Sequence, residues 1–194
     1  MTEPSDASDG RARRSQRSRA AMVEALFELV GEGVLQPTAQ QVAERANVGI
    51  RTVFRHFSDM DSLLAEVDGR VRAKAQPLFL EARTGGSVDE RTRGLVEQRI
   101  RIFEQIAPYK RSGNLQRWRS GFVARQHAAF VRELRTSLLR WLPELRRAPA
   151  ELVEGLDVAL SFEVWDRLRT DQRLGRERAS AALERIAIAL MNTL

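Results

Sequence analysis

Hydrophobic residues recur every three to four positions along most of the chain, which is the period of an amphipathic α-helix. The sequence lacks the sustained alternation of apolar and polar residues that indicates a half-buried strand. The pattern therefore predicts an all-α protein. Helices are expected over residues 15–30, 38–46, 50–57, 59–77, 88–107, 115–142, 150–170 and 176–194, with Pro77 and Pro108 ending or bending two of them.

Two short predicted helices, 38–46 and 50–57, are separated by a three-residue turn. Thr38 can cap the first helix, and Gln41 stands where it can complete a capping box. Asn47 follows the last apolar position, where a helix can end in a left-handed residue. Two helices joined in this way are typical of a helix-turn-helix, and the second helix is then expected to enter the major groove of DNA.

The predicted second helix has one apolar side, with Val53, and a basic side that carries Ile50, Arg51 and Arg55. Arg51 could donate two hydrogen bonds to a guanine, and Ile50 could contact a thymine methyl group. Arg55, one turn later, could reach a base or a phosphate. The alternative for each arginine is a solvated surface charge.

The N-terminal stretch, residues 1–14, is predicted to be a disordered arm that precedes the first helix. Five arginines lie within nine residues that hold no acid: Arg11, Arg13, Arg14, Arg17 and Arg19. Such an arm could contact phosphates or the minor groove, with Arg17 as the candidate, or could remain a solvated tail.

The charge of the whole chain is weak support for DNA binding. The net charge is +6 and the pI is about 10.9, but residues 1–66 hold 8 arginines and 10 acidic residues, a net charge of −2. The excess of positive charge lies in residues 67–194. Individual arginines therefore support DNA binding better than the bulk charge does.

Composition excludes several other classes of protein. Without cysteine and with only two histidines, the chain can form neither a disulfide nor a zinc finger, so no metal or cofactor is expected. No run approaches the ~20 apolar residues of a membrane helix, and the N-terminus lacks the apolar segment of a signal peptide, so a cytoplasmic location is expected. No nucleophile elbow, phosphate loop or metalloprotease motif occurs, which argues against an enzyme.

The stretch from Val42 to Leu63 resembles the signature of TetR-type bacterial repressors, an ordered and gap-free pattern that also includes Asn47-Val48 and the run from Thr52 to Phe57. The resemblance implies a DNA-binding domain over residues 15–66 and a helical regulatory and dimerisation domain over residues 67–194. It also implies a homodimeric repressor that binds a palindromic operator and is released by a small-molecule effector.

The same resemblance assigns roles to individual residues. Thr38, Thr52 and His56 match positions that touch the DNA backbone or hold the motif together. Phe54 and Met60 stand where the family has a tyrosine and a lysine, so two backbone-contacting groups are missing. The complete set of expected DNA-contacting residues is Thr38, Ile50, Arg51, Thr52, Phe54, Arg55, His56 and Arg17.

Aromatic and basic residues are interleaved between Glu104 and Glu133, where no acidic residue occurs. They suggest a pocket for an anionic, partly apolar effector. The alternative is that the aromatic residues are core and the arginines form a solvated face. The candidate pocket residues are Phe103, Tyr109, Trp118, Phe122 and Phe130.

The last two predicted helices are apolar on more than one side, which suggests association with a second subunit. In TetR-type proteins these helices form a four-helix bundle across a dimer. The alternative is that both are internal core helices. The candidate interface residues are Leu156, Leu160, Trp165, Leu183, Ile186 and Leu190.

Two further hypotheses come from other classes of protein. The helix-turn-helix could pack on protein in a helical adaptor, which the Phe54 and Met60 departures would permit. An enzyme that processes a small molecule is the other alternative, although no catalytic motif supports it.

Overall fold

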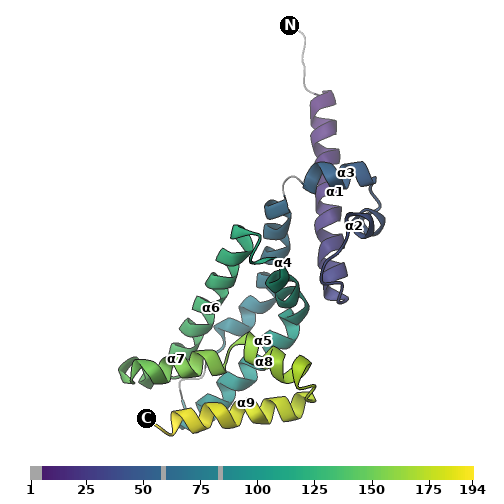
Figure 1. Ribbon diagram of the computed structural model, residues 1–194. Helices are drawn as coiled ribbons and strands as arrows, with labels where there is room; N and C mark the ends of the chain where they lie inside the picture. The colour runs from purple at the N-terminus through teal and green to yellow at the C-terminus, as the bar shows by residue number, and fades with distance from the viewer. Residues whose placement is uncertain (1–5, 58–59, 83–84) are drawn as a thin grey trace. The chain divides into compact units, whose positions relative to one another are not determined.

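The structure is a computed structural model that describes residues 6–57, 60–82 and 85–194. Within these residues every regular element is helical (Figure 1), as the apolar periodicity predicts. The elements are α1 (Asp6–Gly31), α2 (Ala39–Ala46), α3 (Ile50–Phe57), α4 (Met60–Leu80), α5 (Val88–Gln116), α6 (Gly121–Trp141), η1 (Pro143–Arg147), α7 (Ala150–Ala159), α8 (Phe162–Asp166), η2 (Arg167–Asp171, a π-helical turn) and α9 (Arg176–Met191). None of the described helices is long and apolar enough to span a membrane.

The chain forms two compact units. The head unit contains the described parts of residues 1–72 and 108–124, and the body unit contains those of residues 73–107 and 125–194. The predicted boundary between residues 66 and 67 falls inside α4. Segments from α4, α5 and α6 belong to each unit, so neither unit is one continuous stretch of sequence.

The core of the head unit is the inner face of α1 packed against α2 and α3 (Figure 1). Burial of these side chains is the main favourable term that holds the three helices together. The buried residues of these helices are Met22, Val23, Ala25, Leu26, Leu29, Val42, Ala43 and Val53, and Leu63 of α4 joins the same core.

The body unit has its own core, in which aromatic side chains meet from distant parts of the sequence. Phe103 contacts Phe162 edge to face, with ring centroids 5.8 Å apart. Trp141 is buried, donates from Nε1 to the carbonyl oxygen of Glu81 at 3.0 Å, and packs over Gly94. Helices α7 and α9 lie against each other.

Several predicted helix limits are wrong. Helix α1 begins at Asp6 rather than near residue 15, since the Arg- and Ala-rich stretch that follows has high helix propensity. Helix α5 continues through Pro108 to Gln116, and α4 continues through Pro77 to Leu80. Each proline forfeits only one backbone hydrogen bond, which the packing of a long helix can offset.

Two other predicted helices have different limits. Helix α6 begins at Gly121, so Trp118 lies in the turn before it rather than inside it. The helix predicted over residues 150–170 is interrupted at Ser161, whose backbone is extended and whose hydroxyl accepts from the N–H of Val164 at 3.4 Å. A serine in this position competes with the helix by capping the next one.

Candidate DNA-binding site

The helix-turn-helix is built by local hydrogen bonds that the sequence predicts. Gln41 N–H donates to Thr38 Oγ1 at 3.2 Å, and the Gln41 side chain accepts from Thr38 N–H at 2.9 Å, which completes the capping box. At the other end, Asn47 adopts the left-handed conformation (φ 51°, ψ 47°) and Val48 N–H donates to Ala43 at 3.0 Å. These caps fix the ends of α2, and thus the direction in which α3 leaves the turn.

The recognition helix α3 has an inner and an outer side. Val53 is fully buried, while Arg51, Phe54 and Arg55 are exposed, with 62% of Phe54 accessible. An exposed face with two arginines has the donors needed to bind guanine edges or phosphates. Thr52 and His56 are half-buried at the boundary between the two sides.

Ile50 does not lie on the outer side as predicted. Its side chain is half-buried and packs against the core of the head unit. The physical reason is that helical side chains point back toward the N-terminus, so the first residue of α3 covers the turn before it. The base-reading surface is therefore more polar than the sequence suggests. The side chains of Phe57 and Met60 lie outside the described part of the structure.

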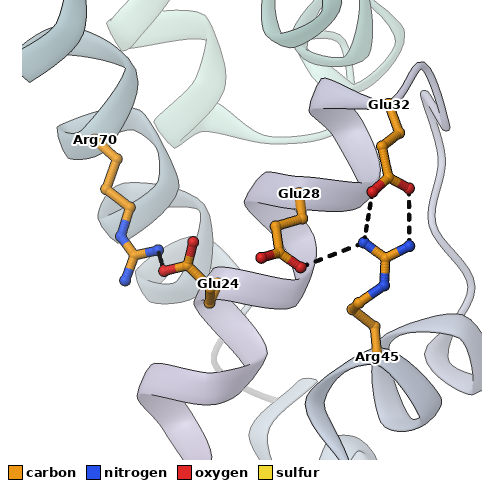
Figure 2. A network of polar contacts seen from close by, with 5 residues as sticks. All are labelled: Glu24, Glu28, Glu32, Arg45 and Arg70. Carbon is orange, nitrogen blue, oxygen red and sulfur yellow. Dashed lines mark hydrogen bonds and ion pairs between the residues drawn. The ribbon is translucent and has the colours of Figure 1, made fainter.

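Glutamates of α1 and of the residue that follows it form ion pairs with arginines of α2 and α4 (Figure 2). Arg45 of α2 donates to Glu32 through both terminal nitrogens, at 2.9 and 2.8 Å, and to Glu28 at 3.3 Å. On the other side of α1, Arg70 of α4 pairs with Glu24. Arg45 thus contributes to the packing of α2 on α1.

The arginines near the N-terminus lie on a helix rather than on a disordered arm. Arg14 Nε donates to the carbonyl oxygen of Gly10, one turn earlier in α1, at 3.2 Å. Arg13 and Arg17 line a shallow depression on the surface of α1 together with Gln16. Arg17 is exposed, so its position is fixed by α1 and a phosphate contact by this residue would need no folding of an arm.

The five aromatic residues predicted to form an effector pocket do not form one cluster. Tyr109 stacks on Phe27 of α1 in the head unit, with ring centroids 4.8 Å apart, whereas Phe130 packs edge-on against another body-unit residue, Phe79. Trp118 is 82% exposed. Helical spacing alone could not separate them, because it does not specify which helices each side chain meets. Phe103 is fully buried and Phe122 half-buried.

Most of the predicted dimer-interface residues are inside the body unit. Buried side chains at these positions cannot contact a second subunit without rearrangement, so the prediction is wrong for four of them: Leu156, Leu160, Trp165 and Leu183. Ile186 is 41% exposed and Leu190 is half-buried. The sequence missed Val158, which is 64% exposed on α7. The segments 150–170 and 176–194 are apolar on two sides. The sequence pattern does not show which of these sides packs inside the body unit and which stays exposed.

A capped short helix, a left-handed turn and an exposed basic helix define a helix-turn-helix DNA-binding protein. Residues 19–67 match the family model for bacterial regulatory proteins of the tetR family. The fold is similar to that of a TetR transcriptional regulator from Rhodococcus sp. RHA1, with a TM-score of 0.57 over 91% of this chain and 96% of that chain, at 20% identity. No curated protein matches the chain. Residues 19–67 are therefore a DNA-binding domain of the tetR type, and the chain shares the fold of a TetR transcriptional regulator.

Proposed function

We propose that this protein is a ligand-responsive transcriptional repressor that binds a palindromic operator as a homodimer and is released by a small-molecule effector. The observation that carries the proposal is the outer side of α3, where Arg51 and Arg55 are exposed on the helix that follows the capped helix α2 and its left-handed turn. Thr38, Thr52, His56 and Arg17 are the further residues proposed to contact the DNA backbone.

The test of DNA binding uses a duplex that the wild-type protein selects from a random-sequence pool. Arg51→Ala is expected to weaken binding about 5- to 150-fold and to relax the preference at one base pair, since a bidentate arginine–guanine contact contributes ~1–3 kcal/mol. Arg147→Ala, which removes an exposed arginine of the body unit, is the matched control. Unchanged binding by both Arg51→Ala and Arg55→Ala would contradict the assignment of α3 as the reading helix.

Salt dependence separates this function from that of a protein-binding adaptor. Phosphate contacts release counterions, so the affinity of a repressor for DNA falls steeply with salt concentration. An adaptor that packs its helix-turn-helix on protein would select no duplex from the pool.

The homodimer is supported by apolar surface on α7 and α9. Val158 and Ile186 are exposed, and Leu190 is half-buried. Two heads are needed because the half-sites of a palindrome lie about one DNA turn (~34–36 Å) apart. Ile186→Glu is expected to yield a folded monomer in sedimentation velocity experiments, whereas Leu183→Glu should unfold the chain because Leu183 is fully buried. A dimer that survives Ile186→Glu would contradict this interface.

The proposed effector is anionic and partly apolar, and its binding site is proposed to lie in the body unit. The support is electrostatic: Arg99 is only 1% exposed, and its Nε and Nη1 atoms have no hydrogen-bond partner among the described residues. A carboxylate that reached these atoms would form charge-assisted hydrogen bonds. Release of the bound duplex by aliphatic carboxylates, but not by the matching amides, is the expected result, and equal release by both would contradict it.

A further inference from the structure

The turn that precedes α6, residues 117–120, belongs to the same compact unit as the helix-turn-helix, although about 60 residues of sequence separate them. Within the head unit, two contacts join residues 108–124 to residues 1–72. Tyr109 stacks on Phe27 of α1, and Ser120 Oγ donates to Asp61 Oδ1 at 2.8 Å. Ser120 Oγ also accepts from Val123 N–H at 3.2 Å, so the hydroxyl group fixes both the turn and the start of α6.

These contacts bring the turn close to the end of the recognition helix. Asp61 is the second residue of α4 and stands four positions after Phe57, the last residue of α3. Four residues of extended chain span at most about 14 Å. The turn, held to Asp61 by Ser120, therefore lies near the C-terminal end of α3.

Residues 108–124 also change the net charge of the head unit from negative to positive. Residues 1–72 hold 10 basic and 11 acidic residues, a net charge of −1, and several of the basic residues are already paired with carboxylates, as in Arg19–Glu66 and Arg70–Glu24. Residues 108–124 add four cations and no acid, which gives the unit a net charge of +3. A surface that binds a polyanion needs this excess of positive charge.

The turn exposes a cation and an aromatic ring together. Arg119 is exposed, Trp118 is 82% exposed, and the Arg117 guanidinium lies 4.8 Å from the centroid of the Trp118 ring. A tryptophan left in water forgoes a large gain from burial, and its flat face and N–H suit a polar, partly apolar partner. The nearby carboxylate, Asp61, accepts the hydrogen bond from Ser120.

From this placement we propose that the turn formed by Arg117, Trp118, Arg119 and Ser120 is a second DNA contact, in which Arg119 binds a backbone phosphate beside the groove and Trp118 covers the adjoining sugar. The inference rests on the proposed DNA-binding function, and it adds a contact from outside the helix-turn-helix. It supplies positive charge at the start of α4, where the head itself has an acidic residue.

The first test is a salt titration of the duplex selected by the wild-type protein, with Arg119→Gln and the control Arg147→Gln. Arg119→Gln is expected to weaken binding about fivefold for every sequence tested and to make the slope of log K against log salt shallower by about 0.9, the value for one phosphate. Arg147→Gln should change neither quantity. A wild-type slope for Arg119→Gln would overturn the proposal and leave the function intact, whereas a wild-type protein that selects no duplex would overturn both.

The second test uses the tryptophans. Trp141 and Trp165 are only 3% and 1% exposed, so quenching by acrylamide reports on Trp118. The selected duplex should protect Trp118 from the quencher, and the protection should be absent in Trp118→Phe. Protection that depends on protein concentration without DNA would assign the turn to a contact between copies of the chain and overturn the proposal.

Discussion

Arg45 and Glu32 form a bidentate ion pair that joins α2 to the C-terminal end of α1, with N–O distances of 2.9 and 2.8 Å (Figure 2). The hydrogen bonds from Arg45 lower the pKa of Glu32 below its usual value of 4.5. A carboxyl group with a lowered pKa in the folded state stabilises the fold above its unfolded pKa, and the stabilisation is lost as the pH falls through the folded value.

Glu32→Gln is therefore expected to lower the Tm more at pH 7 than at pH 3, because the wild type loses the stabilisation from the ion pair as the pH falls and the carboxylate takes up a proton. Thermal unfolding followed by circular dichroism at both pH values measures the difference. Glu97→Gln is the control, because Glu97 is exposed and forms no hydrogen bond or ion pair within the described part of the chain. An equal drop in Tm at both pH values would contradict the role of the ion pair.

Asn47 offers a test of the turn itself. Its left-handed conformation costs a residue with a Cβ atom roughly 1–2 kcal/mol, and asparagine tolerates it better than most other residues do. Asn47→Gly should thus be neutral or stabilise the fold by up to about 1 kcal/mol, while Asn47→Ala should destabilise it by about 1 kcal/mol. Urea denaturation of the two variants gives the comparison, and a more stable Asn47→Ala would contradict the conformation.

The caps of α2 could be predicted because they depend on residues three or four positions apart. The contacts that hold the head together could not, since Arg45–Glu32 and Ser120–Asp61 join residues 13 and 59 positions apart. The same limit explains the interface residues. Apolar positions on α9 mark two faces, and only the packing of α7 shows that Leu183 is internal while Ile186 is exposed.

Gly94 and Gly69 both lie inside helices, but substitution by alanine should have opposite effects on the stability of the fold at the two positions. A Cβ at Gly94 would lie 2.6 Å from Cζ3 of Trp141, whose ring is buried and cannot move freely, whereas a Cβ at Gly69 would meet nothing within 4 Å. Gly94→Ala is expected to destabilise the fold by about 1–3 kcal/mol through overpacking. Gly69→Ala should stabilise it by about 0.5–1 kcal/mol through helix propensity.

Chemical denaturation followed by tryptophan fluorescence measures both glycine variants. Gly94→Ala should also shift the emission of Trp141, which gives a local readout beside the global stability. A Gly94→Ala variant as stable as Gly69→Ala would show that Trp141 can move away, and would contradict tight packing at this contact.

Arg99 and Arg91 are both buried on α5, but among the described residues only Arg91 has an ionic partner. Arg91 Nη1 donates to Glu144 and to the carbonyl oxygen of Trp141, each at 3.0 Å. Arg99 donates from Nη2 to the carbonyl oxygen of Leu134, and burial lowers its pKa to about 9, although Asp157 and Glu133 oppose that shift. A buried cation without a direct counterion destabilises the fold, whereas a paired one is costly to break.

Arg99→Met is therefore expected to leave stability at pH 7 unchanged or to raise it by up to about 2 kcal/mol, while Arg91→Met should lower it by about 1–3 kcal/mol because Glu144 loses its partner. The sign of the pH dependence follows from the lowered pKa. The penalty for burying Arg99 is complete below pH 9 and shrinks as the pH rises above that value, since the folded state releases the proton before the unfolded chain does. Urea denaturation at pH 7 and pH 10 should show a smaller gain for Arg99→Met at pH 10. A large loss of stability in Arg99→Met at pH 7 would instead mean that the guanidinium is paired in solution, and it would remove the electrostatic support for an anionic effector in the body unit.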